Sequence, residues 1–125
     1  MADEIQINVS AVLTNGFLSD LFKPGNISVD QTTLGKGGHA QIIGMSSEVV
    51  DVGDATNGWC FLRNTDDENF VTYGPERYSG TIEIMEPFGK MKPGEWGAFR
   101  LDTGVVLRAQ ADTAECVVDV HVWND

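Results

Sequence analysis

The segment "CVVDVHVW", Cys116–Trp123, alternates between two sets of residues. The set at every second position is small and apolar, and consists of Cys116, Val118, Val120 and Val122. The intervening set is mostly polar or aromatic, and consists of Val117, Asp119, His121 and Trp123. A period of two is that of a half-buried β-strand. The segment therefore predicts a strand whose two sets of side chains point to opposite faces.

The same period appears near the N-terminus in "IQINVSAVL", where Ile5, Ile7, Val9, Ala11 and Leu13 share one face. Further candidate strands cover residues 27–32, 39–45, 48–52, 59–64, 70–73, 80–85, 97–102 and 105–109. Gly, Pro, Asn and Asp separate these strands, as in sandwiches and barrels. We expect an all-β chain that folds as an antiparallel, jelly-roll-like β-sandwich, with a single domain over residues 1–125.

Three short segments predict turns, and one predicts a helical turn. "KPGN" at 23–26 and "KPGE" at 92–95 place Pro and then Gly, which suits a type II turn. "DTG" at 102–104 predicts a hairpin between two apolar strands. "FLSDLF" at 17–22 has apolar residues at near-helical spacing, so it predicts a single helical turn.

The charge of the chain restricts its partners. Nineteen acidic residues against eight basic ones give a net charge of -11. Such a surface repels nucleic acid and anionic membranes, and it lacks the Lys and Arg clusters that counterion release requires. No apolar run reaches the roughly 20 residues of a membrane span. We expect no nucleic-acid or membrane partner, and a partner that is neutral, basic or apolar.

The acidic row Asp66, Asp67 and Glu68 lies in "RNTDDENF". A calcium loop of the EF-hand type alternates its ligands around an invariant Gly, and this segment has neither feature. We expect the tip of a hairpin here, with Asn64 and Asn69 capping its ends through local hydrogen bonds. The sequence predicts no metal site and no cofactor.

No other motif predicts catalysis. "GKGGHA" at 35–40 lacks the Walker pattern and predicts a flexible surface loop. His39 and His121 lie in no metalloprotease motif and beside no nucleophile elbow. Cys60 and Cys116 form no Cys-x-x-Cys pair, so we expect two buried thiols, with a disulfide as the alternative. We expect a protein that is not an enzyme.

Four segments together carry a resemblance: "ISVDQTT", "GWCFLRNTDDENFVTYG", "KMKPGEWGAFRL" and "RAQADTAECVVDV". They resemble a group of small structural proteins of tailed bacteriophages, over roughly residues 27–120. That group tends to show a Gly-aromatic strand ending Arg-Asn-x-Asp, an Asn-aromatic-Val strand, a Lys-Pro-Gly-Glu turn and an Ala-Asp-Thr-Ala segment. This chain departs from the group at Thr65 and in the extra acids Asp67 and Glu68.

The resemblance implies a β-sandwich component of a virion. Packaged DNA would repel this acidic chain inside a capsid, so we expect the outer capsid surface. The resemblance then implies a capsid decoration (cement) protein, made in the host bacterial cytoplasm, that binds the major capsid protein and itself as a homotrimer. The alternatives are a tail, neck or head-fibre component, and a carbohydrate-binding β-sandwich module that uses an exposed Trp59, Trp96 or Trp123.

The candidate partner contacts lie in the termini and one loop: Ile5, Ile7, Phe17, Leu21, Phe22 and Trp123. An N-terminal arm within residues 1–13 would add a strand to the sheet edge of a neighbour. The alternative is that residues 5–13 pair within their own domain. The segment 17–22 is either an apolar patch for a partner or a closure of the core.

Overall fold

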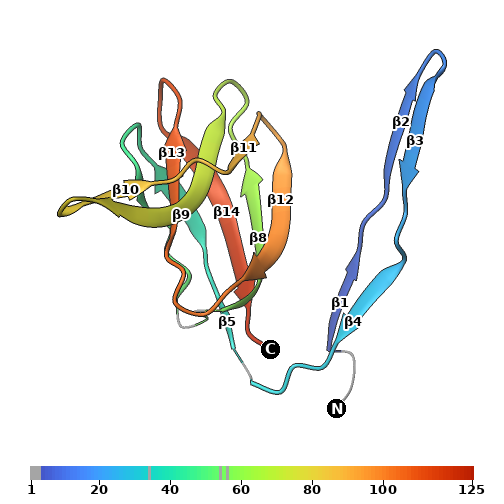
Figure 1. The fold of residues 1–125 in the computed structure, drawn as a ribbon, viewed down its shortest axis with the longest axis horizontal. Coiled ribbons are helices and arrows are strands. Elements are labelled where there is room, and N and C mark those ends of the chain that lie inside the picture. The colour runs from blue at the N-terminus through green and yellow to red at the C-terminus, as the bar shows by residue number, and fades with distance from the viewer. Residues whose placement is uncertain (1–3, 34, 54, 56) are drawn as a thin grey trace. The chain divides into compact units, whose positions relative to one another are not determined.

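The computed structural model describes residues 4–33, 35–53, 55 and 57–125. Over these residues the chain contains fourteen β-strands, all of them in antiparallel pairs, and no helix (Figure 1). The expected all-β, sandwich-like architecture is confirmed. The chain divides into two compact units, one within Met1–Leu34 together with Asp125, the other Gly35–Asn124. The sequence predicted one domain with an arm within 1–13, and residues 1–3 of that arm lie outside the described part.

The first unit is a long two-stranded ribbon. Its outer part pairs β2 (Ala11–Asn15) with β3 (Leu18–Phe22), and its base pairs β1 (Ile5–Asn8) with β4 (Asn26–Val29). The expected strand over residues 5–13 is thus interrupted between β1 and β2, and it pairs within its own unit.

A two-residue turn, Gly16–Phe17, closes the ribbon between Asn15 and Leu18. Gly16 has φ 60, which the tight turns of hairpins require at their first central position. The helical turn predicted over residues 17–22 is therefore wrong. The apolar spacing of this short segment fits a helix, but the turn at Gly16 starts a strand that pairs with β2 along its whole length.

The segment "KPGN" at 23–26 does not reverse the chain. Ala11 pairs with Phe22 and Asn8 pairs with Asn26, so three residues of one strand lie opposite two of the other. Such an extra residue is a β-bulge, which bends the strand. Gly25 takes φ 91, as the predicted turn required, but it serves a bulge within the ribbon.

The second unit contains two five-stranded sheets. In the first sheet the strand order is β10-β9-β13-β7, and β11 also pairs with β9. These strands are β7 (Glu48–Val49), β9 (Val71–Ser79), β10 (Ile82–Met85), β11 (Gly89–Met91) and β13 (Leu107–Ala111). Figure 1 shows that β9 and β10 extend away from the rest of this unit as a hairpin.

In the second sheet the strand order is β12-β8-β14-β5, and β6 also pairs with β14. These strands are β5 (Lys36–Gly37), β6 (Ala40–Ile43), β8 (Gly58–Asn64), β12 (Trp96–Leu101) and β14 (Cys116–Trp123). The two sheets pack through one apolar core. Its largest fully buried side chains are Ile43, Cys60, Leu62, Val71, Met91, Cys116, Val118, Val120 and Val122.

Two connections that the sequence predicted as hairpins join different sheets instead. Residues 65–70 run from β8 to β9, and residues 102–106 run from β12 to β13. A turn does form at Asp102, whose carbonyl accepts a 3.3 Å hydrogen bond from Val105 N. The hairpins do not form because both connections carry the chain from one sheet to the other, so each following strand pairs in the opposite sheet.

The segment "GKGGHA" is an edge strand over much of its length and not a flexible loop. β5 and β6 pair with β14 in one common register. A Cβ at Gly37 would lie 1.9 Å from the Val52 carbonyl oxygen, and one at Gly38 would lie 2.2 Å from that of Val120. The glycines therefore allow close backbone approach, and the expected loop is wrong for this reason.

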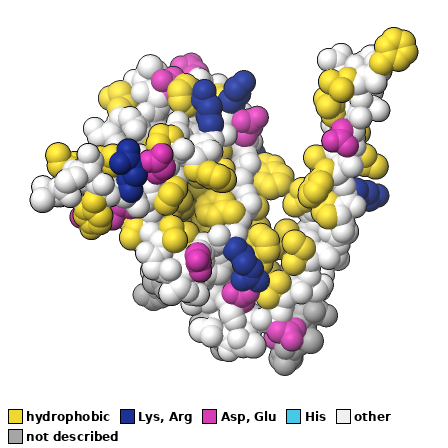
Figure 2. Space-filling model, in the orientation of Figure 1, with side chains coloured by type: hydrophobic (Ala, Val, Ile, Leu, Met, Phe, Trp, Pro, Cys, Tyr) yellow, Lys and Arg dark blue, Asp and Glu magenta, His cyan; other side chains and the backbone are white. Residues whose placement is uncertain are grey.

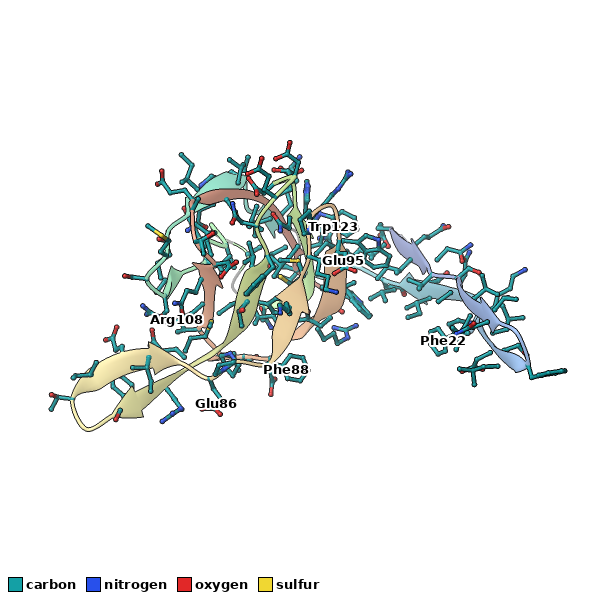
Figure 3. All side chains as sticks on the ribbon, turned by 90° about the horizontal axis from the view of Figure 1, so that it is seen from above. Phe22, Glu86, Phe88, Glu95, Arg108 and Trp123 are labelled. Carbon is teal, nitrogen blue, oxygen red and sulfur yellow. The ribbon has the colours of Figure 1, made fainter. Side chains whose placement is uncertain are left out.

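An ion pair is buried on the first sheet where β13 meets β9, and Figure 3 labels its arginine, Arg108. Arg108 Nη1 lies 2.7 Å from Glu76 Oε2, and both side chains are 11% exposed. The guanidinium also donates to the Ser47 hydroxyl and carbonyl, at 2.9 and 2.8 Å. Its charge is thus neutralised and each of its three nitrogens donates a hydrogen bond, which compensates for the burial of an arginine.

This geometry predicts that Arg108→Ala lowers the free energy of unfolding by about 3–5 kcal/mol, because the variant leaves the Glu76 carboxylate buried without its partner. The matched control is Arg77→Ala. Arg77 also pairs with a carboxylate, Glu86, but the two side chains are 52% and 55% exposed, and exposed pairs contribute about 0–1 kcal/mol. Urea unfolding measures both variants. Equal losses of unfolding free energy in the two variants would contradict a larger contribution of the buried pair.

Candidate functional site

The acidic loop after β8 is organised by its first acid and two asparagines. The buried Asn64 amide donates to the carbonyls of Asn69 at 2.9 Å and Met91 at 3.1 Å, and its oxygen accepts from Asp66 N at 3.0 Å. Asp66 in turn accepts from the backbone of Asn69 at 2.6 Å and of Glu68 at 3.0 Å. The capping role predicted for Asn64 is confirmed, and this stretch is structural.

The other two acids of the row do not converge with Asp66. Asp67 and Glu68 are exposed, and the described residues contain no group of three His, Cys, Asp or Glu side chains able to hold a metal. The turn at 92–95 closes the neighbouring connection as predicted, with Glu95 N donating to the Lys92 carbonyl at 3.0 Å and Gly94 at φ 79.

The two loop acids make a matched pair of variants. Hydrogen bonds from the backbone of Asn69 and Glu68 hold the pKa of Asp66 below its usual 3.8. A carboxyl whose pKa is lower in the folded state stabilises the fold above its unfolded pKa, and loses this contribution as the pH falls through the folded value.

We therefore expect Asp66→Ala to lower the thermal midpoint of unfolding at pH 7. Below about pH 4 the difference between the midpoints of the variant and the wild type should shrink progressively. Asp67→Ala should leave the midpoint within the error of measurement. Thermal unfolding followed by circular dichroism at several pH values measures both. An equal change of the midpoint in the two variants would contradict a stabilising role that belongs to Asp66 and not to Asp67.

The two thiols are buried and free. Burial raises the pKa of Cys60 to about 12, and burial also raises the pKa of Cys116. A thiol in this state is a poor nucleophile and a poor metal ligand. The prediction of two buried thiols is confirmed, and both sulfurs belong to the core of the second unit.

The outer face of the second sheet carries aromatic and charged side chains. Pairing of β12, β8 and β14 places Trp96, Arg63 and Asp119 in one row across the strands, and Ala98, Phe61 and His121 in the next. Phe61 contacts Trp123 with ring centroids 4.7 Å apart. This face is built from the outward half of the alternation that places the core residues on the other side.

The hairpin of the first unit exposes apolar residues along its length (Figure 2). Every residue of β2 and β3 is exposed. At the turn the Phe17 side chain is fully open to solvent, at 110% relative exposure. The other large apolar side chains exposed on this hairpin are Val12, Leu13, Leu18, Leu21 and Phe22.

The candidate partner contacts divide into three groups. Phe17, Leu21 and Phe22 are exposed on the β2–β3 hairpin, so they do not close a core; Figure 3 labels Phe22. Ile5 and Ile7 are buried, and their strand pairs with β4. Trp123 is half-buried in β14. Within the first unit the buried and the exposed residues form separate groups, and the role of all six residues as contacts stays a prediction.

Sequence reasoning named none of the charged residues of the outer face as site residues. The alternation of β14 did place Asp119 and His121 on this face, but the neighbours of a strand are not local in sequence. Arg63 and Trp96 join them only through the register of β8 and β12. The buried ion pair of Arg108 was not predicted from the sequence for the same reason.

Comparison of the chain with protein-family models, curated proteins and solved structures finds no match. Among the described residues there is no helix with the length and apolar character needed to cross a membrane.

Proposed function

We propose that this chain is a structural protein of a tailed-phage virion, and specifically a capsid decoration protein that binds the outer capsid surface and stabilises the head. The observation that carries the proposal is the β2–β3 hairpin. It presents large apolar side chains to solvent on a two-stranded ribbon, as expected of a segment that becomes buried against a partner on assembly.

The two faces of the hairpin support this role. The register places Val12 opposite Leu21 on one face, and Ala11 opposite Phe22 on the other. A two-stranded hairpin is marginally stable in water without a further layer. Large exposed apolar patches on soluble proteins mark interaction sites. A groove between neighbouring shell subunits covers both faces, whereas a flat surface covers only one.

The distribution of charge supports it as well. From Asn8 to Phe22 the only charged residue is Asp20. Residues 35–124 carry fourteen Asp or Glu and seven Lys or Arg, a net charge of -7. An apolar hairpin lets an acidic body attach to a shell through contacts that need few charges, while the acidic body keeps the free protein soluble. Binding through the hairpin should therefore resist added salt.

The partners in this proposal are the major capsid protein and further copies of the chain as a homotrimer, with assembly following synthesis in the host cytoplasm. Many copies that each make modest contacts add up to strong resistance to internal pressure. The resemblance to small phage structural proteins supports a place in the particle. A position in the tail, neck or a head fibre is the outcome that a reconstruction of the intact particle would distinguish.

The test mixes purified protein with undecorated heads of the phage that encodes it, and measures bound protein by sedimentation. We expect saturable binding at a fixed ratio to the capsid protein. Leu21→Thr and Phe22→Thr should each weaken it by about 10- to 100-fold, because burying such a side chain contributes about 1.5–3 kcal/mol. Threonine favours strands, so the hairpin keeps its propensity.

The matched control is Ile82→Thr, a side chain that is 66% exposed at the start of β10 in the second unit. It should bind as wild type does. A loss with Leu21→Thr alone would indicate a flat docking surface in place of a groove. Absence of binding to heads, or particle density at the tail, would overturn the proposal.

A further inference from the structure

The outer face of the second sheet contains a shallow depression of about 290 Å³. Its lining comes from three adjacent strands, β12, β8 and β14, and includes Phe61, Arg63, Trp96, Gly97, Asp119 and His121. Ligand pockets range from roughly 300 to 1,000 Å³, so a depression at the lower end of this range has room for no more than a single small ring. Because the lining residues sit on paired strands, their spacing is fixed by the sheet.

The polar groups of the depression are available to a ligand. Among the described residues, the side chains of Arg63, Asp119 and His121 form no hydrogen bond or ion pair. Trp96 is 58% exposed, and it lies in the same cross-strand row as Arg63 and Asp119. An aromatic face, a carboxylate, a guanidinium and an imidazole thus border one open space.

The mixture of these groups restricts the ligand. An anion would be repelled by Asp119, and a cation by Arg63. The centre of a protein interface is depleted in charged residues. Because this depression has charged residues in its lining, it does not resemble the centre of such an interface. A neutral ring with several hydroxyl groups meets the requirement, because each hydroxyl both donates and accepts.

We propose that this depression binds one neutral pyranose ring of a glycan. The face of the Trp96 indole carries negative charge density, so it attracts the slightly positive C–H bonds of a sugar ring. Asp119 accepts hydrogen bonds from the sugar hydroxyls, and Arg63 and His121 donate to the sugar oxygens. Hydrogen bonds to ionised groups are about twice as strong as neutral ones, which offsets the small contact area.

This binding site is independent of the virion proposal. It lies within the second unit and is measured on the isolated chain, whereas attachment to heads is assigned to the hairpin of the first unit. Failure of one proposal therefore leaves the other untouched.

The test is a titration of the full ¹⁵N-labelled chain with glucose, galactose, mannose and N-acetylglucosamine, each to about 100 mM, far above a millimolar dissociation constant. We expect saturable shifts of the Trp96 indole N–H and of the Arg63 and Asp119 amides with at least one sugar. Trp96→Ala and Asp119→Asn should each weaken binding at least about tenfold, and Trp96→Phe should retain part of it.

The matched control is Phe88→Ala, which removes an aromatic ring that is 81% exposed and lies outside this sheet (Figure 3). It should bind as wild type does. Spectra of each variant outside the depression show whether the fold is intact. Absence of a saturable shift with all four sugars would overturn the proposal, as would shifts that persist unchanged in Trp96→Ala.

Discussion

The register between β8 and β14 is the constraint on which the second unit depends. Pairing Val120 with Leu62 and Val122 with Cys60 directs four apolar side chains into the core. The same pairing directs Phe61 and His121 outward. A slip of one residue would exchange the two sets, exposing the core residues and burying charged ones. Core and outer face are therefore two consequences of one hydrogen-bond register.

Asn64 connects this sheet to the other. It ends β8, is fully buried, and its side-chain amide donates to the Met91 carbonyl in β11 of the first sheet. Its backbone also bonds to the turn before β12, through Glu95 O at 2.9 Å and Gly94 N at 3.0 Å. A buried amide with satisfied donors fixes the position of one sheet over the other, where apolar packing alone would leave neighbouring registers similar in energy.

Local pattern predicted most of the strands, although it missed β3, β5 and β11, but it did not predict which strands pair. The alternation in Cys116–Trp123 predicted both faces of β14 correctly, because burial of one face follows from residue type. The sequence predicted chain reversals after Asn64 and Asp102, but the prediction that each reversal forms a hairpin was wrong. Which sheet the next strand joins depends on packing between distant residues. β9 also continues to Ser79, past Pro75, a residue that usually ends a strand. The depression around Trp96 needed three strands in register, which no local spacing reveals.

The two units differ in what stabilises them: the second encloses a core, whereas the β2–β3 hairpin of the first leaves its apolar residues in water. Hydrogen exchange of backbone amides, compared between the free protein and protein bound to heads, tests this difference directly. We expect amides of β2 and β3 to exchange rapidly in the free protein and slowly on heads, and those of β8 and β14 to be protected in both. Equal protection of β2 and β3 in the two states would contradict a hairpin that is completed by its partner.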